Sequence, residues 1–251
     1  MKSANFQPTA RGLGRRFLFL AGSLLLTTLA GAQQLTNLFF LHHSTGNGLI
    51  VEGNLRGMIQ AYNAAHGSAF AFWDHGYSYD GLRNPAGEDT GVNSGYPTDN
   101  TDPDGLHYIF TSAEAEAADC RNQILANHQV IAFKSCFPAS EIPDAAALNQ
   151  YQTYYLEMRS AFDLRPDRIF VVMSTPPLHR LATSAASAAN ARAFANWLKS
   201  NEYLGGHSNV VCFDLFDQLA GGDNFLKAEY EGSPTSDDSH PNPQANQTVG
   251  P

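Results

Sequence analysis

Two short segments near opposite ends of the chain contain the side chains that acyl transfer requires. The first is 41–46 (LHHSTG), which directly follows an apolar run, and the second is 237–240 (DDSH). A serine hydroxyl, a histidine base and a carboxylate that orients the base together form a hydrolytic nucleophile. We therefore take Ser44, His240 and Asp237 as the candidate catalytic residues.

Each of these segments also has an ordinary structural interpretation. Ser44 stands where the apolar run gives way to a helix-like segment, a position typical of a helix N-cap. The residues of the D-x-x-H sequence at 237–240 are common in polar surface turns. His42 and His43 are consecutive, so on an extended segment they face opposite ways and cannot both serve one nucleophile. The catalytic interpretation depends on whether the fold brings the two segments together.

Apolar runs alternate with helix-like segments along the chain, which is typical of a parallel sheet covered by helices on both faces. The apolar runs predict five strands, at 35–41, 69–73, 129–134, 168–173 and 209–214. The spacing and composition of the segments between them predict helices at 47–65, 111–127, 143–162 and 184–200.

Polar residues gather at the expected C-terminal ends of these strands. Right-handed crossovers place those ends at one edge of a parallel sheet, where ligand sites form. The residues that follow strand ends are Ser44, Gly76, Ser135, Cys136, Ser174 and Thr175. The sequence therefore predicts that the hydroxyl of Ser44 points into a cleft at this edge of the sheet.

The segment 74–110 is the exception to the alternation and is expected to be nearly all loop. A loop of this length is usually functional or disordered, and its tyrosines indicate an ordered lid or a substrate wall. These tyrosines are Tyr77, Tyr79, Tyr96 and Tyr108. Within the segment, 100–105 (NTDPDG) is similar to the start of a calcium loop. Thr111 stands where such a loop needs glutamate, so a turn-rich loop is favoured.

In motif order and spacing, most of the chain after residue 32 resembles the SGNH/GDSL hydrolase superfamily. The resemblance rests on a strand–Ser–helix unit at Ser44, five strand–helix units, and D-x-x-H-P just before a last helix. The H-H-S-T-G form of the first block resembles a less characterised branch. The resemblance implies a three-layer α/β/α fold with a flavodoxin-like five-stranded parallel sheet. It also implies a serine esterase in which Ser44 is the nucleophile, His240 the base and Asp237 its orienting carboxylate.

The oxyanion hole is where this chain departs from the family pattern. The resemblance implies amides of Ser44 and Gly76 as donors, with Gly81 as a second choice for the glycine. The family's asparagine is missing after the third strand, and Cys136 occupies its place. A thiol is a weak donor, so Ser135 or a backbone amide is an alternative to Cys136. Losing one good oxyanion donor costs about a hundredfold or more in rate.

Residues 1–32 have the pattern of a secretory signal peptide. Four cationic residues, Lys2, Arg11, Arg15 and Arg16, precede a 13-residue apolar stretch, Phe17 to Leu29, and Ala30-Gly31-Ala32 is a small-x-small cleavage site. We predict cleavage after Ala32 and a single mature domain at 33–251 that is secreted or periplasmic. Removing the four cations takes the formal net charge from -9 to -13. An acidic surface excludes nucleic acid and an anionic membrane as expected partners.

These features predict an exported serine esterase whose substrate is a small-molecule or polysaccharide ester, with O-acetyl groups on a carbohydrate as one candidate. We expect no cofactor and no metal. Two alternatives remain open. The first alternative is a non-catalytic glycan-binding module on the same fold, and the missing asparagine favours it. Less favoured is a metal-dependent hydrolase built from the His and Asp residues of the two segments, because their irregular spacing is poor evidence for a metal site.

Overall fold

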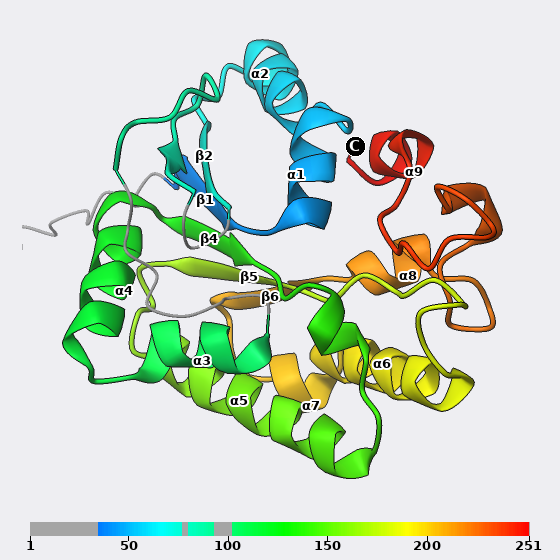
Figure 1. The fold of residues 1–251 in the computed structure, drawn as a ribbon. Helices are drawn as coiled ribbons and strands as arrows, with labels where there is room; N and C mark the ends of the chain where they lie inside the picture. The colour runs from blue at the N-terminus through cyan, green and yellow to red at the C-terminus, as the bar shows by residue number, and fades with distance from the viewer. Residues whose placement is uncertain (1–34, 77–79, 93–101, 251) are drawn as a thin grey trace, which may run out of the picture. The chain divides into compact units, whose positions relative to one another are not determined.

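A central sheet organises the chain in the computed structural model, which describes residues 35–76, 80–92 and 102–250 (Figure 1). The strands are β1 (Asn37–Leu41), β2 (Ala71–His75), β3 (Leu82–Arg83), β4 (Val130–Phe133), β5 (Ile169–Met173) and β6 (Val210–Phe213). All five predicted strands are present, each shifted or shortened by a few residues. The three-layer α/β prediction is confirmed.

The sheet has six strands in the order β3-β2-β1-β4-β5-β6. All neighbours pair in parallel except β2 and β3, which are antiparallel. The prediction of a five-stranded, wholly parallel sheet therefore missed an edge strand, because β3 is only two residues long. Taken alone, the parallel strands have the flavodoxin-like order 2-1-3-4-5, whose switch point lies between β1 and β4.

Helices cover the sheet on both faces (Figure 1). The α-helices are α1 (Ser44–Val51), α2 (Leu55–His66), α3 (Pro103–Thr111), α4 (Ala115–Asn127), α5 (Ala145–Asp163), α6 (Ala185–Leu198), α7 (Asn201–Leu204), α8 (Leu215–Leu219) and α9 (Pro243–Val249). Short 3-10 helices are η1 (Phe137–Ser140) and η2 (Ala228–Tyr230). In Figure 1, α1, α2 and α9 lie on one side of the sheet and α3, α5, α6 and α7 on the other.

The single helix predicted at 47–65 is in fact two helices, and the first begins earlier. The break between α1 and α2 falls at Gly53 and Asn54, where Asn54 adopts a left-handed conformation with φ 54°. A side chain at Gly53 would lie 2.5 Å from the carbonyl oxygen of Leu49 and 2.6 Å from that of Asn246. The close approach of α9 therefore fixes this turn.

The segment 74–110 contains more regular structure than the prediction of a long loop allows. Residues 103–111 form α3, with Pro103 in its first turn, a position that proline favours. The predicted helix at 111–127 is represented by α4, which begins only at Ala115. Tyr77, Tyr79 and Tyr96, with the first two residues of the calcium-like stretch, lie outside the described residues, as does the predicted signal peptide.

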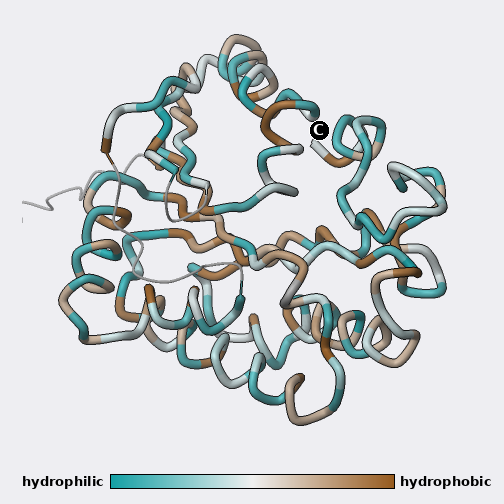
Figure 2. The backbone as a smooth tube through the Cα atoms, viewed as in Figure 1, coloured by the Kyte–Doolittle hydropathy of each residue, from teal (hydrophilic) through white to brown (hydrophobic). Residues whose placement is uncertain are grey.

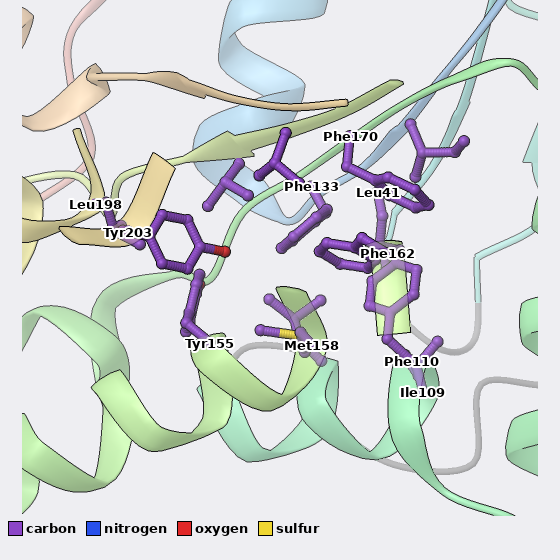
Figure 3. Packing of buried hydrophobic residues seen from close by; sticks show 14 of the residues in the cluster. Leu41, Ile109, Phe110, Phe133, Tyr155, Met158, Phe162, Phe170, Leu198 and Tyr203 are labelled. Atoms are coloured by element: carbon purple, nitrogen blue, oxygen red, sulfur yellow. The ribbon is translucent and has the colours of Figure 1, made fainter. Parts of the chain in front are cut away.

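The larger of two apolar clusters lies between the sheet and helices α3 to α7 (Figure 3). Phe162 of α5 stacks on Phe170 of β5 with ring centroids 3.9 Å apart, and Phe110 meets Phe162 edge-on at 5.1 Å. The second cluster, on the other face, includes Phe40, Leu49 and Phe72. Figure 2 shows apolar residues along the central strands. This core holds the strand ends, and the residues that follow them, in fixed positions.

Three further properties of the described residues concern the cysteine thiols and the length of apolar helices. Cys120, Cys136 and Cys212 are all free thiols. Burial raises the pKa of the Cys212 thiol to about 12. Among the described residues, no helix combines the length and apolarity needed to cross a membrane.

Candidate active site

Ser44 is the first residue of α1 and follows β1 after only two residues. The N-cap of α1 is His43, and its side chain makes no capping hydrogen bond. The alternative that Ser44 merely caps the helix is therefore wrong. The first backbone N–H groups of a helix have no acceptor within it and lie at the positive end of the helix dipole. The Ser44 amide is one of these groups.

The hydroxyl of Ser44 meets His240, as the two sequence segments predicted. Nε2 of His240 lies 2.8 Å from Oγ of Ser44, across 196 residues of sequence. The ring of Phe137 packs edge-on against the imidazole, with centroids 5.0 Å apart and an interplanar angle of 89°. These contacts bring the start of α1, the η1 turn after β4 and the loop before α9 together at one edge of the sheet.

The carboxylate beside His240 is that of Asp238, whereas the sequence predicted Asp237. Oδ1 of Asp238 lies 2.5 Å from Nδ1 of His240 and accepts the backbone N–H of the same residue at 3.0 Å. An aspartate readily accepts from the backbone two residues ahead, and here the same turn also places its carboxylate at the imidazole. The hydrogen bonds with His240 lower the pKa of Asp238 below its usual value. Asp237 is exposed.

The loop that holds His240 is anchored by a buried group that the sequence did not indicate. Oγ of Ser239 accepts the backbone N–H of His179 at 2.9 Å. His179 is fully buried, and its Nε2 lies 3.3 Å from Oε2 of Glu231. Asn242 caps α9 and donates to the carbonyl oxygen of Glu231 at 3.0 Å. His179 and Glu231 lie in irregular segments, so neither periodicity nor a motif points to them.

Cys136 is the residue after β4 whose side chain reaches the serine. Its Sγ lies 3.8 Å from Oγ of Ser44, and the thiol is buried. The hydroxyl of Ser135 instead lies 3.4 Å from the Tyr155 hydroxyl, within the core. Of the two side chains proposed to replace the missing asparagine, Cys136 is therefore the one at the serine.

Gly76 follows β2 and lines the same cavity as Ser44. A Cβ atom at this position would lie 2.2 Å from Oδ2 of Asp80, so any larger residue requires Asp80 to move. Gly81 meets a similar limit, because its Cβ would lie 2.4 Å from Oδ1 of Asp89. Gly81 does not line the cavity beside Ser44, so Gly76 remains the better candidate donor.

A buried ion-pair network lies behind the serine. The carboxylate of Asp74 is fully buried and contacts Arg56, His42 at 3.0 Å and Arg83 at 3.5 Å. Burial lowers the pKa of His42 to about 4. Its Nδ1 lies 2.9 Å from the carbonyl oxygen of His43 and its Nε2 faces Asp74, and the single N–H of the neutral ring donates to one of these two oxygens. His42 therefore supports the site and is not available as a base for Ser44.

Lys134 directly follows β4 and is completely buried. Its Nζ donates to the carbonyl oxygen of Ser135 at 3.3 Å, and burial lowers its pKa. Within the described ranges, no group of three or more His, Cys, Asp and Glu side chains is arranged to hold a metal ion.

Two polar cavities meet at Ser44, and a third adjoins them. The first, of about 290 Å³, is lined by His42, His43, Ser44, Asn47, Gly76, Asp80 and Arg83. The second, of about 150 Å³, is lined by Ser44, Thr45, Asn47, Gly48, Glu52, His240, Pro241 and Asn246. The third, of about 420 Å³, shares Asn47 and Arg83 with the first. Amide, carboxylate and guanidinium groups thus surround the serine.

No protein-family model matches the chain, and no curated protein matches it in sequence. Its structure is similar to that of a Streptococcus pneumonia protein described as a "putative platelet activating factor", with 13% identity and a TM-score of 0.47 over 88% of this chain and 83% of that one. It is also similar to a "putative acylhydrolase" from Bacteroides fragilis, with 12% identity and a TM-score of 0.43 over 87% and 84%. Because both TM-scores are below 0.5, neither protein supports an assignment of function.

Proposed function

We propose that this protein is a serine esterase of the SGNH type, with Ser44 as nucleophile and His240 as general base. The observation that supports the proposal most directly is the 2.8 Å contact between Oγ of Ser44 and Nε2 of His240. The two residues come from opposite ends of the sequence and meet at the switch point of the sheet, where ligands bind in open α/β folds.

In the proposed reaction, His240 takes the hydroxyl proton of Ser44 as Oγ attacks the ester carbonyl. Asp238 accepts a hydrogen bond from the Nδ1–H group, which keeps Nε2 unprotonated and ready to act as the base. The imidazolium then gives its proton to the leaving alcohol, and an acyl-serine remains. Water, deprotonated by the same imidazole, hydrolyses the acyl-serine and restores the hydroxyl.

The proposed oxyanion hole combines the amides of Ser44 and Gly76 with the thiol of Cys136. The Ser44 amide is supported by its place at the start of α1, where the helix dipole favours negative charge. The thiol is a weaker donor than an amide group, so we expect slower turnover than a site with asparagine at position 136 would give.

For substrate and location, we propose an exported enzyme that begins at Gln33 and cleaves a polar ester such as an O-acetylated carbohydrate. The polar lining of the cavities at Ser44 favours a hydrophilic substrate over a long acyl chain. The glycan-binding alternative is favoured by one feature, which is the absence of the asparagine donor.

Covalent labelling with a fluorophosphonate separates the two functions. An esterase gains one adduct per chain on Ser44, because the activated hydroxyl displaces fluoride. The adduct is absent from Ser44→Ala and forms much more slowly in His240→Ala. A folded wild-type protein that gains no adduct while it binds glycans would favour the binding module.

A further inference from the structure

The 290 Å³ cavity beside Ser44 contains a cationic group to which the proposed mechanism gives no role. Arg83 lines this cavity and the adjoining 420 Å³ cavity. It lies on β3 directly opposite Asp74 of β2, in the antiparallel register. Its side chain is 35% exposed.

The charge of Arg83 is only loosely neutralised by the protein. Asp74 is its ion-pair partner among the described residues, at 3.5 Å, and no hydrogen bond joins the two side chains. The oxygens of Asp74 already accept from Arg56 and lie against His42 at 3.0 Å. Arg56 is more fully used, because it also donates to the carbonyl oxygens of Phe72 and Asn84 and so makes three hydrogen bonds to the protein. Arg83 lines the cavity that contains Ser44, and no side-chain hydrogen bond from its guanidinium to the described residues occupies its donors, so they are available to a ligand.

The positions of Arg83 and His240 indicate which half of an ester would meet the guanidinium. His240 lines the 150 Å³ cavity and not the one that contains Arg83. Because the general base passes its proton to the leaving alcohol, the alcohol lies on the His240 side of Ser44. The acyl group then lies on the other side, with Gly76 and Arg83. The carboxylate of Asp80 lies near Gly76, at the same end of the cavity. It disfavours an acyl group that carries more than one anionic substituent.

We propose that Arg83 binds a carboxylate on the acyl group, so that the preferred substrates are mono-esters of short dicarboxylic acids; this inference rests on the proposed esterase function. Arginine matches a carboxylate with two parallel N–H donors. The cavity has the volume of about ten water molecules, at roughly 30 Å³ each, which accommodates a four- or five-carbon diacid.

The test compares monoethyl succinate with ethyl butyrate, which has a similar length and no charge, in a pH-stat. Hydrolysis of the first with water gives succinate, ethanol and one proton. We expect the wild type to prefer monoethyl succinate in kcat/KM. In Arg83→Gln the ratio of kcat/KM for monoethyl succinate to that for ethyl butyrate should fall by about tenfold to a hundredfold. This is the effect expected from the loss of a hydrogen bond to a charged group. The readout is the ratio of the two kcat/KM values, so a loss common to both esters does not count for the inference.

Arg165→Gln is the matched control, because Arg165 is 36% exposed, forms one ion pair at 3.4 Å and lines a different cavity. This variant should keep the wild-type preference. A further substrate pair, acetoxyacetate and ethyl acetate, places the carboxylate on the alcohol side instead. A preference for acetoxyacetate that Arg83→Gln removes would overturn the assignment to the acyl side.

Binding to the Ser44→Ala variant separates this inference from the esterase proposal. Calorimetry should show that Ser44→Ala binds monoethyl succinate more tightly than ethyl butyrate. Adding Arg83→Gln to this variant should abolish the difference in affinity. Equal binding and equal turnover of the two esters would overturn the inference while leaving the esterase intact. Selective binding without any turnover by the folded wild type would support the carboxylate subsite and overturn the esterase.

Discussion

Replacing each of the two neighbouring aspartates by asparagine tests which carboxylate orients His240. Asp238 contacts Nδ1 of the imidazole at 2.5 Å, while Asp237 contributes only a backbone oxygen, to the Ser239 hydroxyl at 3.4 Å. Asp238→Asn leaves the shape of the turn nearly unchanged but removes the negative charge. We therefore expect it to impair hydrolysis, and Asp237→Asn to change it by no more than about twofold.

The size of the loss follows from the exposure of the pair. A hydrogen bond to a charged group contributes about 1.5–3 kcal/mol. The side chains of His240 and Asp238 are 47% and 61% exposed, so water screens the interaction and places it near the lower end of that range. A loss of about 1.5–2 kcal/mol corresponds to a roughly tenfold to thirtyfold fall in kcat/KM. A fully buried triad aspartate would produce a far larger fall, of about 10⁴.

The assay is hydrolysis of p-nitrophenyl acetate by the wild type and both variants, with circular dichroism to verify that each is folded. We expect the highest kcat/KM for the wild type, a similar value for Asp237→Asn and a clearly lower value for Asp238→Asn. The reverse order would refute the geometric reasoning and assign the orienting role to Asp237, as the D-x-x-H spacing predicted.

Three further predictions follow from the groups around the serine. Cys136→Asn should raise kcat/KM toward p-nitrophenyl acetate by about tenfold or more, because an amide donates to the oxyanion better than a thiol; a fall would show that the thiol has a different role. Burial lowers the pKa of His42 and of His75 from 6.5 to about 4. The unfolded chain binds more protons between these values, so the urea-measured free energy of unfolding should fall between pH 6.5 and pH 4, by roughly 3 kcal/mol for each ring; a flat profile would contradict the burial of neutral rings. Gly46→Ala should destabilise the fold by about 1–3 kcal/mol in the same assay, because its Cβ would lie 2.4 Å from that of His42; unchanged stability would mean that the first turn of α1 packs loosely against His42.

The sequence was sufficient to predict the parts of the fold that depend on apolar runs. Each predicted strand is present, and the edge of the sheet at which Ser44 and Cys136 were expected to meet is where their side chains lie 3.8 Å apart. These predictions succeed because buried parallel strands need continuous apolar residues, and because right-handed crossovers leave few possible topologies.

The errors in the sequence-based prediction concern local geometry that depends on distant contacts. The turn at Gly53 that separates α1 from α2 is set by the close approach of α9. The selection of Asp238 over Asp237 depends on a turn whose backbone is held through Ser239 and the buried His179. Arg83 escaped notice because a two-residue edge strand has no periodicity that a sequence pattern can reveal.

The most direct test of the central proposal is the rate of p-nitrophenyl acetate hydrolysis by the purified protein beside Ser44→Ala and His240→Ala. The 2.8 Å contact between the two side chains predicts that wild-type turnover is lost in both folded variants. Turnover that persists in Ser44→Ala at the wild-type rate would contradict the assignment of Ser44 as the nucleophile.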